Sequence, residues 1–263
     1  MKPLQLWPAA ARRQLLGVFT DIDDTLTTEG VATDDALRAI AALREAGLHV
    51  IPITGRPVGW SEPFAREWPV NAIVAENGAV ALIPAGAAGL QKIYQQNEAT
   101  RTANFARIQT VAQRIVAKVP GASLSRDSAG RETDIAIDHS EFATLAQHSI
   151  AQVVKLMQDE GMNATVSSIH INGWLGSHNK LAGARWIVRE LFGRELDAEI
   201  GRWVYVGDST NDVLMFEHFP HGIGVANIRR FEAQLTHPPE FITLSERGAG
   251  FAEVAKAVLS SRR

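Results

Sequence analysis

The stretch Leu15-Leu16-Gly17-Val18-Phe19-Thr20-Asp21-Ile22-Asp23-Asp24-Thr25 begins with an apolar run and ends in a cluster of acids. A second stretch repeats this plan, because Trp203-Val204-Tyr205-Val206 is followed by Gly207-Asp208-Ser209-Thr210-Asn211-Asp212. Each apolar run is typical of a buried β-strand. If the two strands are parallel neighbours, both clusters lie at the carboxyl edge of one sheet, where open α/β folds bind ligands. Crowded carboxylates repel one another unless a cation lies among them, so the pattern predicts a site for a hard metal ion.

The composition narrows the class of protein. The chain has 263 residues, of which 46% are apolar and 21% are charged, as is usual for a globular protein with a sizeable core. A net charge of -3 provides no basic field, so we expect neither nucleic acid nor a membrane surface as a partner. The absence of cysteine excludes disulfides and thiolate metal sites. No apolar stretch approaches the roughly 20 residues that span a bilayer, and we find no export signal. These features predict a cytoplasmic location and leave the oligomeric state open.

Strand and helix patterns alternate on either side of a central segment with a different order. Strands are expected at 15–20, 49–54, 72–75, 202–206, 222–226 and 240–244, and helices at 33–46, 177–192 and 251–259. Between them, a small-residue linker leads into two expected helices, at 101–119 and 141–160, each followed by two short strands. We therefore predict an α/β fold with a doubly wound parallel-sheet (Rossmann-like) core made of residues 1–84 and 174–263. Residues 85–173 are predicted to form an inserted α+β domain.

The first acidic cluster suits covalent chemistry. Asp21 and Asp23 lie two residues apart at a strand end, so one carboxylate can face the crevice while the loop turns the other over it. The first position suits a nucleophile that also binds a metal, and the second suits proton transfer. The alternative is a strand-to-turn junction whose polar side chains accept backbone amides. Asp208 and Asp212 have a similar alternative, in which they cap the short helix that follows them.

Two further positions suit phosphate. Thr54-Gly55-Arg56 follows a predicted strand and offers a hydroxyl, an unobstructed backbone and a guanidinium. The alternative is a threonine-capped turn with a solvated arginine. Lys180 lies in the first turn of a predicted helix, where a cation opposes the helix dipole. This local conflict favours a functional role, although a solvated surface lysine is the alternative.

Taken together and in this chain order, these groups resemble the four motifs of the haloacid dehalogenase-like (HAD) phosphatase superfamily. The motif residues that match are Asp21, Asp23, Thr25, Thr54, Lys180, Gly207, Asp208 and Asp212. The inserted segment looks like the α/β cap of the sugar-phosphate phosphatase branch, as do Glu76-Asn77-Gly78-Ala79 and Ser168-Ile169-His170-Ile171-Asn172. The latter is similar to the end of the cap in sucrose-, trehalose- and mannosylglycerate-phosphate phosphatases. Asp24 departs from the pattern, because many members have glycine there.

The resemblance implies a Mg²⁺-dependent phosphomonoester hydrolase that acts on a small phosphorylated metabolite, such as a sugar phosphate, through an aspartyl-phosphate. Asp21 would be the nucleophile and Asp23 the acid and base. Mg²⁺ would be bound by the Asp21 carboxylate, the Asp23 backbone carbonyl and Asp208. The other implied roles are phosphate binding by Thr54, Gly55 and Lys180, support of the metal by Asn211 and Asp212, and substrate contacts from Arg56, Asn77, Arg131, His170 and Asn172.

Two alternatives to hydrolysis follow from the same residues. A phosphosugar mutase or phosphotransferase would pass the phosphoryl group to a second sugar hydroxyl instead of water. A regulatory protein would bind a phosphorylated metabolite without chemistry. The intact pair Asp21 and Asp23 speaks against the second, because a binding module does not need an acid at position 23.

Overall fold

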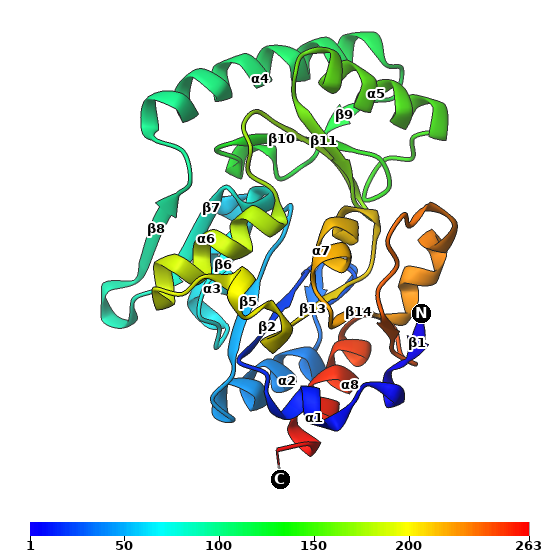
Figure 1. Cartoon of the computed structure of the whole chain (residues 1–263). Helices are drawn as coiled ribbons and strands as arrows, with labels where there is room; N and C mark the ends of the chain where they lie inside the picture. Colours follow the sequence, from blue (N-terminus) through cyan, green and yellow to red (C-terminus); the bar gives the residue numbers. More distant parts are fainter. Residues whose placement is uncertain (263) are drawn as a thin grey trace.

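The computed structural model describes residues 1–262 and has two parts, a larger one around a parallel sheet and a smaller one above it (Figure 1). The sheet has six strands in the order β1-β15-β14-β13-β2-β5, and every neighbouring pair is parallel. Their bounds are Lys2–Pro3 (β1), Phe241–Ile242 (β15), Gly222–Gly224 (β14), Trp203–Gly207 (β13), Gly17–Thr20 (β2) and His49–Pro52 (β5).

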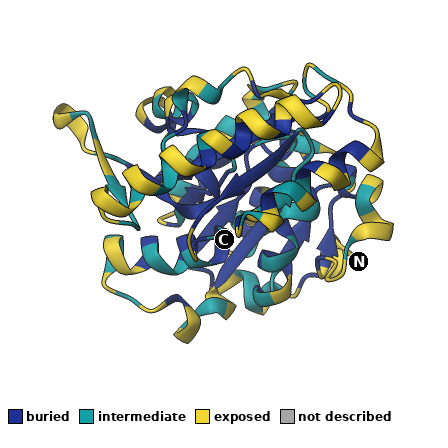
Figure 2. Cartoon of the chain, turned by 90° about the horizontal axis from the view of Figure 1, so that it is seen from above, coloured by how far each residue is buried: buried dark blue, intermediate teal, exposed yellow. Residues whose placement is uncertain are grey.

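Helices cover both faces of this sheet, and Figure 2 shows the buried strands between helices that are exposed on their outer sides. One face packs against α2 (Asp34–Glu45), α3 (Val58–Glu67) and α8 (Arg247–Ser260), and the other against α6 (Lys180–Phe192) and α7 (Val213–His218). The short α1 (Ala9–Arg13) lies against α8. Successive strand residues point to opposite faces, so Val18 packs on the α2 and α8 side and Phe19 on the α6 side. The predicted α/β fold with a doubly wound core is confirmed.

The two strands that carry the acidic clusters are direct neighbours. β13 pairs with β2 in the register Val204 with Val18 and Val206 with Thr20. The amide of Asp21 continues the pairing by donating to the carbonyl of Val206 at 2.8 Å. Both chains therefore leave the sheet at the same edge, which places Asp21 and Asp208 in one crevice.

A second, antiparallel sheet extends the larger part toward the smaller one. It consists of β6 (Ile73–Ala75), β7 (Val80–Pro84) and β8 (Leu90–Tyr94). The strand predicted at 72–75 forms, and within residues 1–262 its backbone pairs with the main sheet through the single parallel bridge between Ile53 and Val74. β8 continues this hairpin before the chain enters the smaller part. The division of the chain at residues 84/85 and 173/174 stays a prediction.

The smaller part is a four-stranded antiparallel sheet covered on one side by two helices (Figure 1). The strands, in spatial order, are β11 (Asn163–Val166), β12 (His170–Trp174), β10 (Asp134–Asp138) and β9 (Ser123–Leu124), and the helices are α4 (Glu98–Lys118) and α5 (Gln147–Asp159). Ile135, Ile137 and Ile171 pack under the helices. The polar residues that alternate with them, His170 and Asn172 among them, face the larger part.

The helix expected at 141–160 begins six residues later than the sequence predicts. The carboxylate of Asp138 accepts the amides of Glu141 at 2.9 Å and Phe142 at 3.0 Å. These bonds satisfy backbone donors without helical geometry, so the segment before α5 remains a loop. As a consequence, the side chain of Glu141 faces the crevice between the two parts. No helix within residues 1–262 has the length and hydropathy needed to cross a membrane.

The return connection from the smaller part contains a buried histidine whose titration should weaken the fold in acid. Neither ring nitrogen of His178 has a hydrogen-bond partner in the described chain, and burial lowers its pKa from 6.5 to about 4. The unfolded chain therefore binds a proton at a higher pH than the folded protein does, so stability is lost as pH falls from 6.5 toward 4. We expect the free energy of unfolding to fall by about 2 kcal/mol between about pH 7 and pH 5 from this group.

Urea denaturation of the wild type and of His178→Leu at both pH values tests this expectation. The variant should lose most of that pH dependence. An equal loss in both proteins would contradict the assignment to His178.

Candidate active site

The crevice above β2 and β13 holds three carboxylates and one ammonium. Oxygens of Asp21, Asp208 and Asp212 all lie within 4.8 Å of one another. The Lys180 ammonium lies 2.9 Å from Asp21 Oδ1 and 2.7 Å from Asp212 Oδ1. All four side chains are buried. Asn179 positions the lysine, because its side chain caps α6 by accepting the amide of Ala182 at 2.8 Å.

Asp208 has one carboxylate oxygen that accepts no hydrogen bond from the described chain. Its Oδ2 accepts a hydrogen bond from Asn227 Nδ2 at 3.1 Å. Its Oδ1 is buried and has no hydrogen-bond partner in the described chain. A buried carboxylate oxygen without a donor is costly. A divalent cation would satisfy this oxygen and offset the excess of three carboxylates over one lysine.

Asp212 organises the loop that presents Asp208. Its Oδ2 accepts the amides of Asp208 at 2.9 Å and Ser209 at 3.2 Å, which completes a capping box. Its Oδ1 accepts from Lys180 and from the hydroxyl of Tyr205. The capping that the sequence suggests as an alternative is therefore present, and it coexists with a place in the acidic group.

Burial and mutual repulsion govern the protonation of these acids. Burial raises the pKa of Asp21 to about 7, although Lys180 opposes the rise. Burial, together with the charges of Asp212 and Asp21, also raises the pKa of Asp208 well above its ordinary value. Burial alone would lower the pKa of Lys180, but Asp21 and Asp212 outweigh it and the pKa lies above its usual range. The lysine is therefore held charged, whereas a bound cation would stabilise the charged forms of the acids.

Gly55 lines the crevice just beyond β5, and the buried Thr54 precedes it in the chain. The Thr54 hydroxyl accepts the amide of Arg56 at 3.0 Å, which leaves its proton free to donate. A Cβ at Gly55 would lie 3.2 Å from Asn172 Oδ1 and 3.3 Å from Asn77 Oδ1. The Gly55 carbonyl also accepts Arg131 Nη1 at 3.0 Å and Asn172 Nδ2 at 3.2 Å. A side chain at position 55 would force these two amides to shift by a few tenths of an ångström, so glycine favours the close approach of the two parts.

Arg56 is fully engaged between the two parts of the molecule. Its Nε donates to both oxygens of Asp23, at 3.0 and 3.1 Å. Its terminal nitrogens donate to Asp127 at 3.1 Å and Glu141 at 2.7 Å, both from the smaller part. Burial raises the pKa of Asp23, and Arg56 opposes that rise. The guanidinium thus fixes the carboxylate that the sequence predicts to transfer protons.

The polar face of the smaller sheet meets the crevice. Arg131 Nη1 donates to Asp134 at 2.8 and 2.9 Å, and Asn172 Nδ2 donates to the same carboxylate at 3.2 Å. Asn77 approaches it from the larger part, at 3.5 Å. The ring of His170 lies 2.8 Å from Glu141 Oε2. The four predicted substrate contacts of this group all make contacts with other protein side chains in this structure; they are Arg131, Asn172, Asn77 and His170.

The two parts are closed on each other. A cavity of about 10 Å³ remains between Asp21, Asp23 and the residues above them, which is about the room that one water needs. The predicted site residues that border it are Asp21, Asp23, Gly55, Arg56, His170, Asn172 and Asn211. Lys180 and Asn77 border a neighbouring cavity. Residues from widely separated parts of the chain thus converge on one small space.

Several residues of this crevice were not predicted from the sequence. Glu76 accepts the amides of Glu132 at 2.9 Å and Thr133 at 2.6 Å, and so ties the two parts together. Asn227 donates a hydrogen bond to Asp208, and Glu141 accepts one from Arg56. Only the neighbourhood of Glu76 had a sequence signal, because Glu76-Asn77-Gly78 follows a predicted strand. Isolated residues such as Asn227 have no pattern that would distinguish them.

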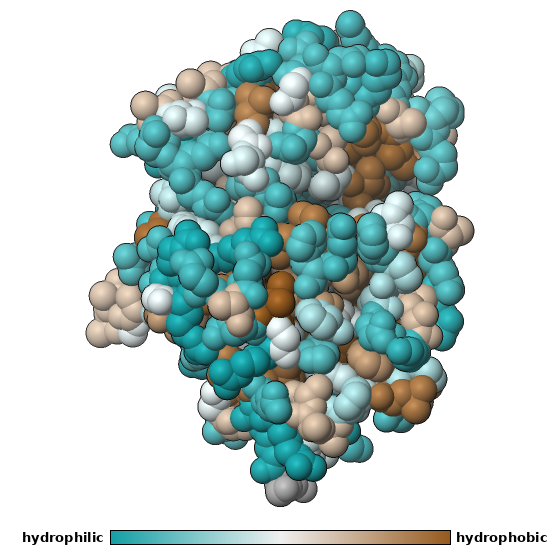
Figure 3. Space-filling model, viewed as in Figure 1, coloured by the Kyte–Doolittle hydropathy of each residue, from teal (hydrophilic) through white to brown (hydrophobic). Residues whose placement is uncertain are grey.

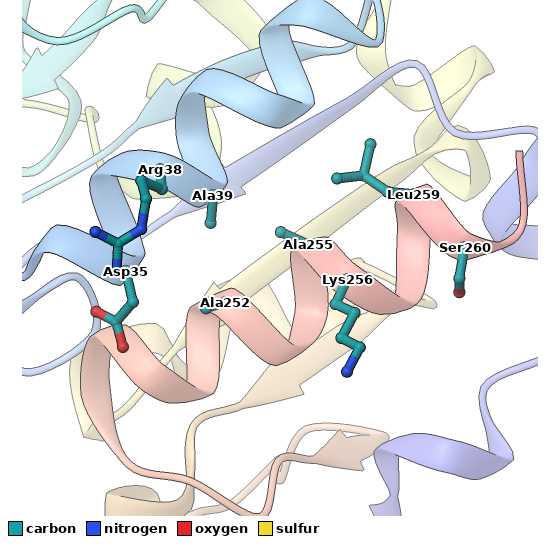
Figure 4. Close-up of a pocket in the computed structure, with 8 residues that line it drawn as sticks. All are labelled: Asp35, Arg38, Ala39, Ala252, Ala255, Lys256, Leu259 and Ser260. Carbon is teal, nitrogen blue, oxygen red and sulfur yellow. The ribbon is translucent and has the colours of Figure 1, made fainter. Parts of the chain in front are cut away.

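Cavities elsewhere lack this chemistry. One of about 400 Å³ lies between α2 and α8, lined by small side chains such as Ala39 and Ala255 with Arg38 and Lys256 beside them (Figure 4). None of the predicted site residues borders it. On the face shown in Figure 3, apolar side chains reach the surface in small separate areas among hydrophilic ones. The crevice at the sheet edge is therefore the candidate active site.

Known proteins resemble this chain in part of its sequence and in its fold. The model of the haloacid dehalogenase-like hydrolase family matches residues 18–118, which include Asp21, Asp23 and Thr54. A search of curated proteins finds no match. Among solved structures, a Thermoplasma acidophilum protein superposes with a TM-score of 0.69 and 17% identity, covering 93% of this chain and 99% of that one.

Two further structures have names that describe an activity. The sucrose-phosphatase of Synechocystis, solved with sucrose and phosphate, has a TM-score of 0.66 and 16% identity, covering 94% of this chain and 98% of that one. The C-terminal domain of trehalose-6-phosphate phosphatase from C. albicans also has a TM-score of 0.66, with 14% identity and 96% of each chain covered. At these identities the superpositions show the shared fold.

The family model covers residues 18–118, and within that range the predicted resemblance to haloacid dehalogenase-like hydrolases is confirmed. Together with the fold shared with structures named as phosphatases, this match supports the prediction of an enzyme of the phosphatase class.

Proposed function

We propose that this protein is a Mg²⁺-dependent phosphomonoester hydrolase that acts on a small phosphorylated metabolite, a sugar phosphate, through an aspartyl-phosphate. One observation carries the proposal. Asp21 lies in a buried group with Asp208, Asp212 and Lys180, and it borders the same cavity as Asp23. A nucleophile, a cation site and a proton donor therefore meet at one point.

The residues fit a divalent ion. Asp21 and Asp208 would hold Mg²⁺, together with the Asp23 backbone carbonyl, because hard cations prefer oxygen ligands. The unpartnered Oδ1 of Asp208 is the ligand that the fold leaves free. Bound Mg²⁺ would neutralise charge on the phosphoryl oxygens. Asp212 would act indirectly, since its oxygens already hold Lys180 and the amides of the loop.

The chain's own groups account for the two chemical steps. Asp21 would attack phosphorus in line, and Asp23 would give its proton to the leaving oxygen. Asp23 would then take a proton from the water that cleaves the aspartyl-phosphate. Thr54 and Lys180 would donate to the phosphoryl oxygens as their charge develops. Arg56 would hold the Asp23 carboxylate in place during both proton transfers.

Substrate entry requires the two parts to separate. The cavity above Asp21, at about 10 Å³, has no room for a phosphoryl group. The ion pairs of Arg56 with Asp127 and Glu141 and the bond from Thr210 Oγ1 to the carbonyl of Val166 at 2.7 Å link the parts in this closed state. Closure over the substrate would exclude bulk water from the reaction.

Phosphate release from hexose, disaccharide and glycerate phosphates, and from an aryl phosphate, tests the proposal. We expect turnover with Mg²⁺ and none with a chelator. Thr54→Val should lower kcat by about 10²–10³-fold, because it removes one donor to the transition state. Thr110→Val, which alters an exposed threonine of α4, is the matched control and should retain activity.

The alternatives give different results in the same assay. A mutase or phosphotransferase would move phosphate between sugars without steady release. A binding protein would be inactive on the whole panel, and Asp21→Asn would then change nothing. Either result would contradict the proposed hydrolase.

A further inference from the structure

Two larger cavities flank the small one above Asp21. The first, of about 440 Å³, lies between the segment after the acid pair, the start of α8 and the loop before α5. We call it the Asp24–Arg247 cavity, after two of the residues of the larger part that line it. The second, of about 360 Å³, lies between α6 and β11. Both volumes fall in the range of small-molecule sites, so either could hold the part of a substrate that leaves.

The position of Asp23, the proposed proton donor, decides which of the two cavities holds the leaving group. Asp23 and Arg56 border the Asp24–Arg247 cavity and are absent from the lining of the other. Of these two larger cavities, Lys180 and Asn211 border only the second, between α6 and β11. The leaving oxygen must lie within hydrogen-bond reach of the group that protonates it. Given the proposed function, on which this inference rests, the leaving group therefore extends into the Asp24–Arg247 cavity.

Backbone strain is concentrated around this cavity. Among residues 1–262, five non-glycine residues have positive φ, and three of them line it: Asp24 at 52°, Glu29 at 52° and Arg247 at 55°. Such a conformation is strained for a non-glycine residue, and it persists where the surroundings impose it, often at ligand sites. Glycine would adopt it without strain. The strained backbone around the cavity therefore favours a role of these side chains in binding.

Asn227 holds two of these strained residues together. Its Nδ2 donates to the carbonyl of Asp24 at 2.9 Å, and its Oδ1 accepts the amide of Arg247 at 2.9 Å. The side chains then meet, with Arg247 Nε 3.1 Å from Asp24 Oδ1. The guanidinium of Arg247 makes no hydrogen bond in the described chain. Its remaining donors are available to a ligand beside the Asp24 carboxylate.

The charges of the lining define the class of leaving group. Four carboxylates, those of Asp23, Asp24, Glu29 and Glu141, face two guanidiniums, those of Arg56 and Arg247. The donors of Arg56 are already engaged by three acids. With Asp23 protonated as the proposed acid, the other three carboxylates still exceed the two guanidiniums by one negative charge, which disfavours a second carboxylate or phosphate on the substrate. Hydroxyl groups, by contrast, can donate to the acids and accept from Arg247, while Phe142 and Ile169 contribute apolar surface.

We propose that Asp24 and Arg247, which line this cavity from the larger part, determine the specificity of the enzyme by binding hydroxyl groups of a neutral leaving sugar or polyol. The wild type should then hydrolyse hexose 6-phosphate with a kcat/KM about 10-fold or more above that for 3-phosphoglycerate. An aryl phosphate serves as a reference substrate that reports the catalytic groups without requiring hydroxyl contacts.

Asp24→Gly and Arg247→Gln test the contacts. Each variant should lower the ratio of kcat/KM for hexose 6-phosphate to that for the aryl phosphate by about 10-fold, mainly through KM, since each removes a hydrogen-bond partner of the hydroxyls. Asp24→Gly also removes the cost of its positive φ, so the variant should unfold at a temperature close to that of the wild type. Arg230→Gln is the control, because Arg230 is exposed and pairs with Glu246 outside the cavity.

The failure of this inference is distinguishable from the failure of the proposed function. If the wild type hydrolyses the aryl phosphate with Mg²⁺ but prefers 3-phosphoglycerate, or if both variants retain the wild-type ratio, the specificity assignment is overturned and the hydrolase stands. If the wild type releases no phosphate from any of these compounds, the proposed function fails and this inference fails with it.

Discussion

Replacing Asp21 by asparagine should lower the rate of phosphate release by about 10⁴-fold or more, because the loss of a covalent nucleophile removes the route itself. The change keeps the shape of the side chain. It also removes one of three buried negative charges, in a group where burial raises the pKa of Asp21 to about 7. Folding should therefore be retained, and the free energy of unfolding should equal or exceed that of the wild type.

Steady-state kinetics with an aryl phosphate and urea denaturation of the same preparations measure the two effects. Asp197→Asn makes the same chemical change at an exposed ion pair with Arg185 and should leave the rate unchanged. A folded Asp21→Asn protein that keeps more than about a tenth of the wild-type rate would show that another group attacks phosphorus. A folded, inactive variant would locate the chemistry at Asp21.

Replacing Lys180 by methionine should damage both stability and activity. Its ammonium is the only cation within hydrogen-bond distance of Asp21 and Asp212 among residues 1–262, at 2.9 and 2.7 Å. Its removal leaves buried carboxylates uncompensated, which should lower the free energy of unfolding by about 3–5 kcal/mol in the presence of a chelator. Mg²⁺ should recover part of this loss, because it would neutralise the same acids. The rate should fall by about 10²–10³-fold from loss of a donor to the phosphoryl oxygens.

Denaturant titrations with a chelator and with Mg²⁺ separate these contributions. Lys155→Met is the matched control, since Lys155 forms an exposed pair with Asp159 that should contribute less than about 1 kcal/mol. If Lys180→Met and the control lost similar stability, the acids would have to be protonated in the folded protein. A Mg²⁺ effect equal in the wild type and both variants would argue against a metal among these carboxylates.

The fold was largely predictable because it depends on local patterns. Continuous apolar runs identified β2 and β13, and both form as parallel neighbours. The strand predicted at 72–75 also forms, and it pairs with β7. One prediction needed correction, because α5 begins at Gln147 rather than at residue 141, where Asp138 holds the preceding amides. This difference arises from hydrogen bonds whose partners a propensity argument cannot select.

The candidate site was predictable where it follows strand ends, and less so where the two parts meet. Asp21 and Asp208 follow neighbouring strands, so their encounter depends on strand order alone. The bonds of Arg56 to Asp127 and Glu141 join residues 71 and 85 positions apart. Glu141 was expected within a helix, yet its loop position makes that contact possible. Whether a buried arginine contacts substrate or protein depends on how two separately folded surfaces meet.

Local patterns along the chain set the alternation of strands and helices, the acids at two strand ends and the lysine at a helix start, because periodicity and capping act over a few residues. Three features of the site depend instead on the folded molecule: Asp208 keeps an oxygen without a partner in the described chain, Asn227 joins Asp24 to Arg247, and Asp23 lines the Asp24–Arg247 cavity. Each of these depends on distances between segments remote in the chain, which are set by the close packing of the whole molecule.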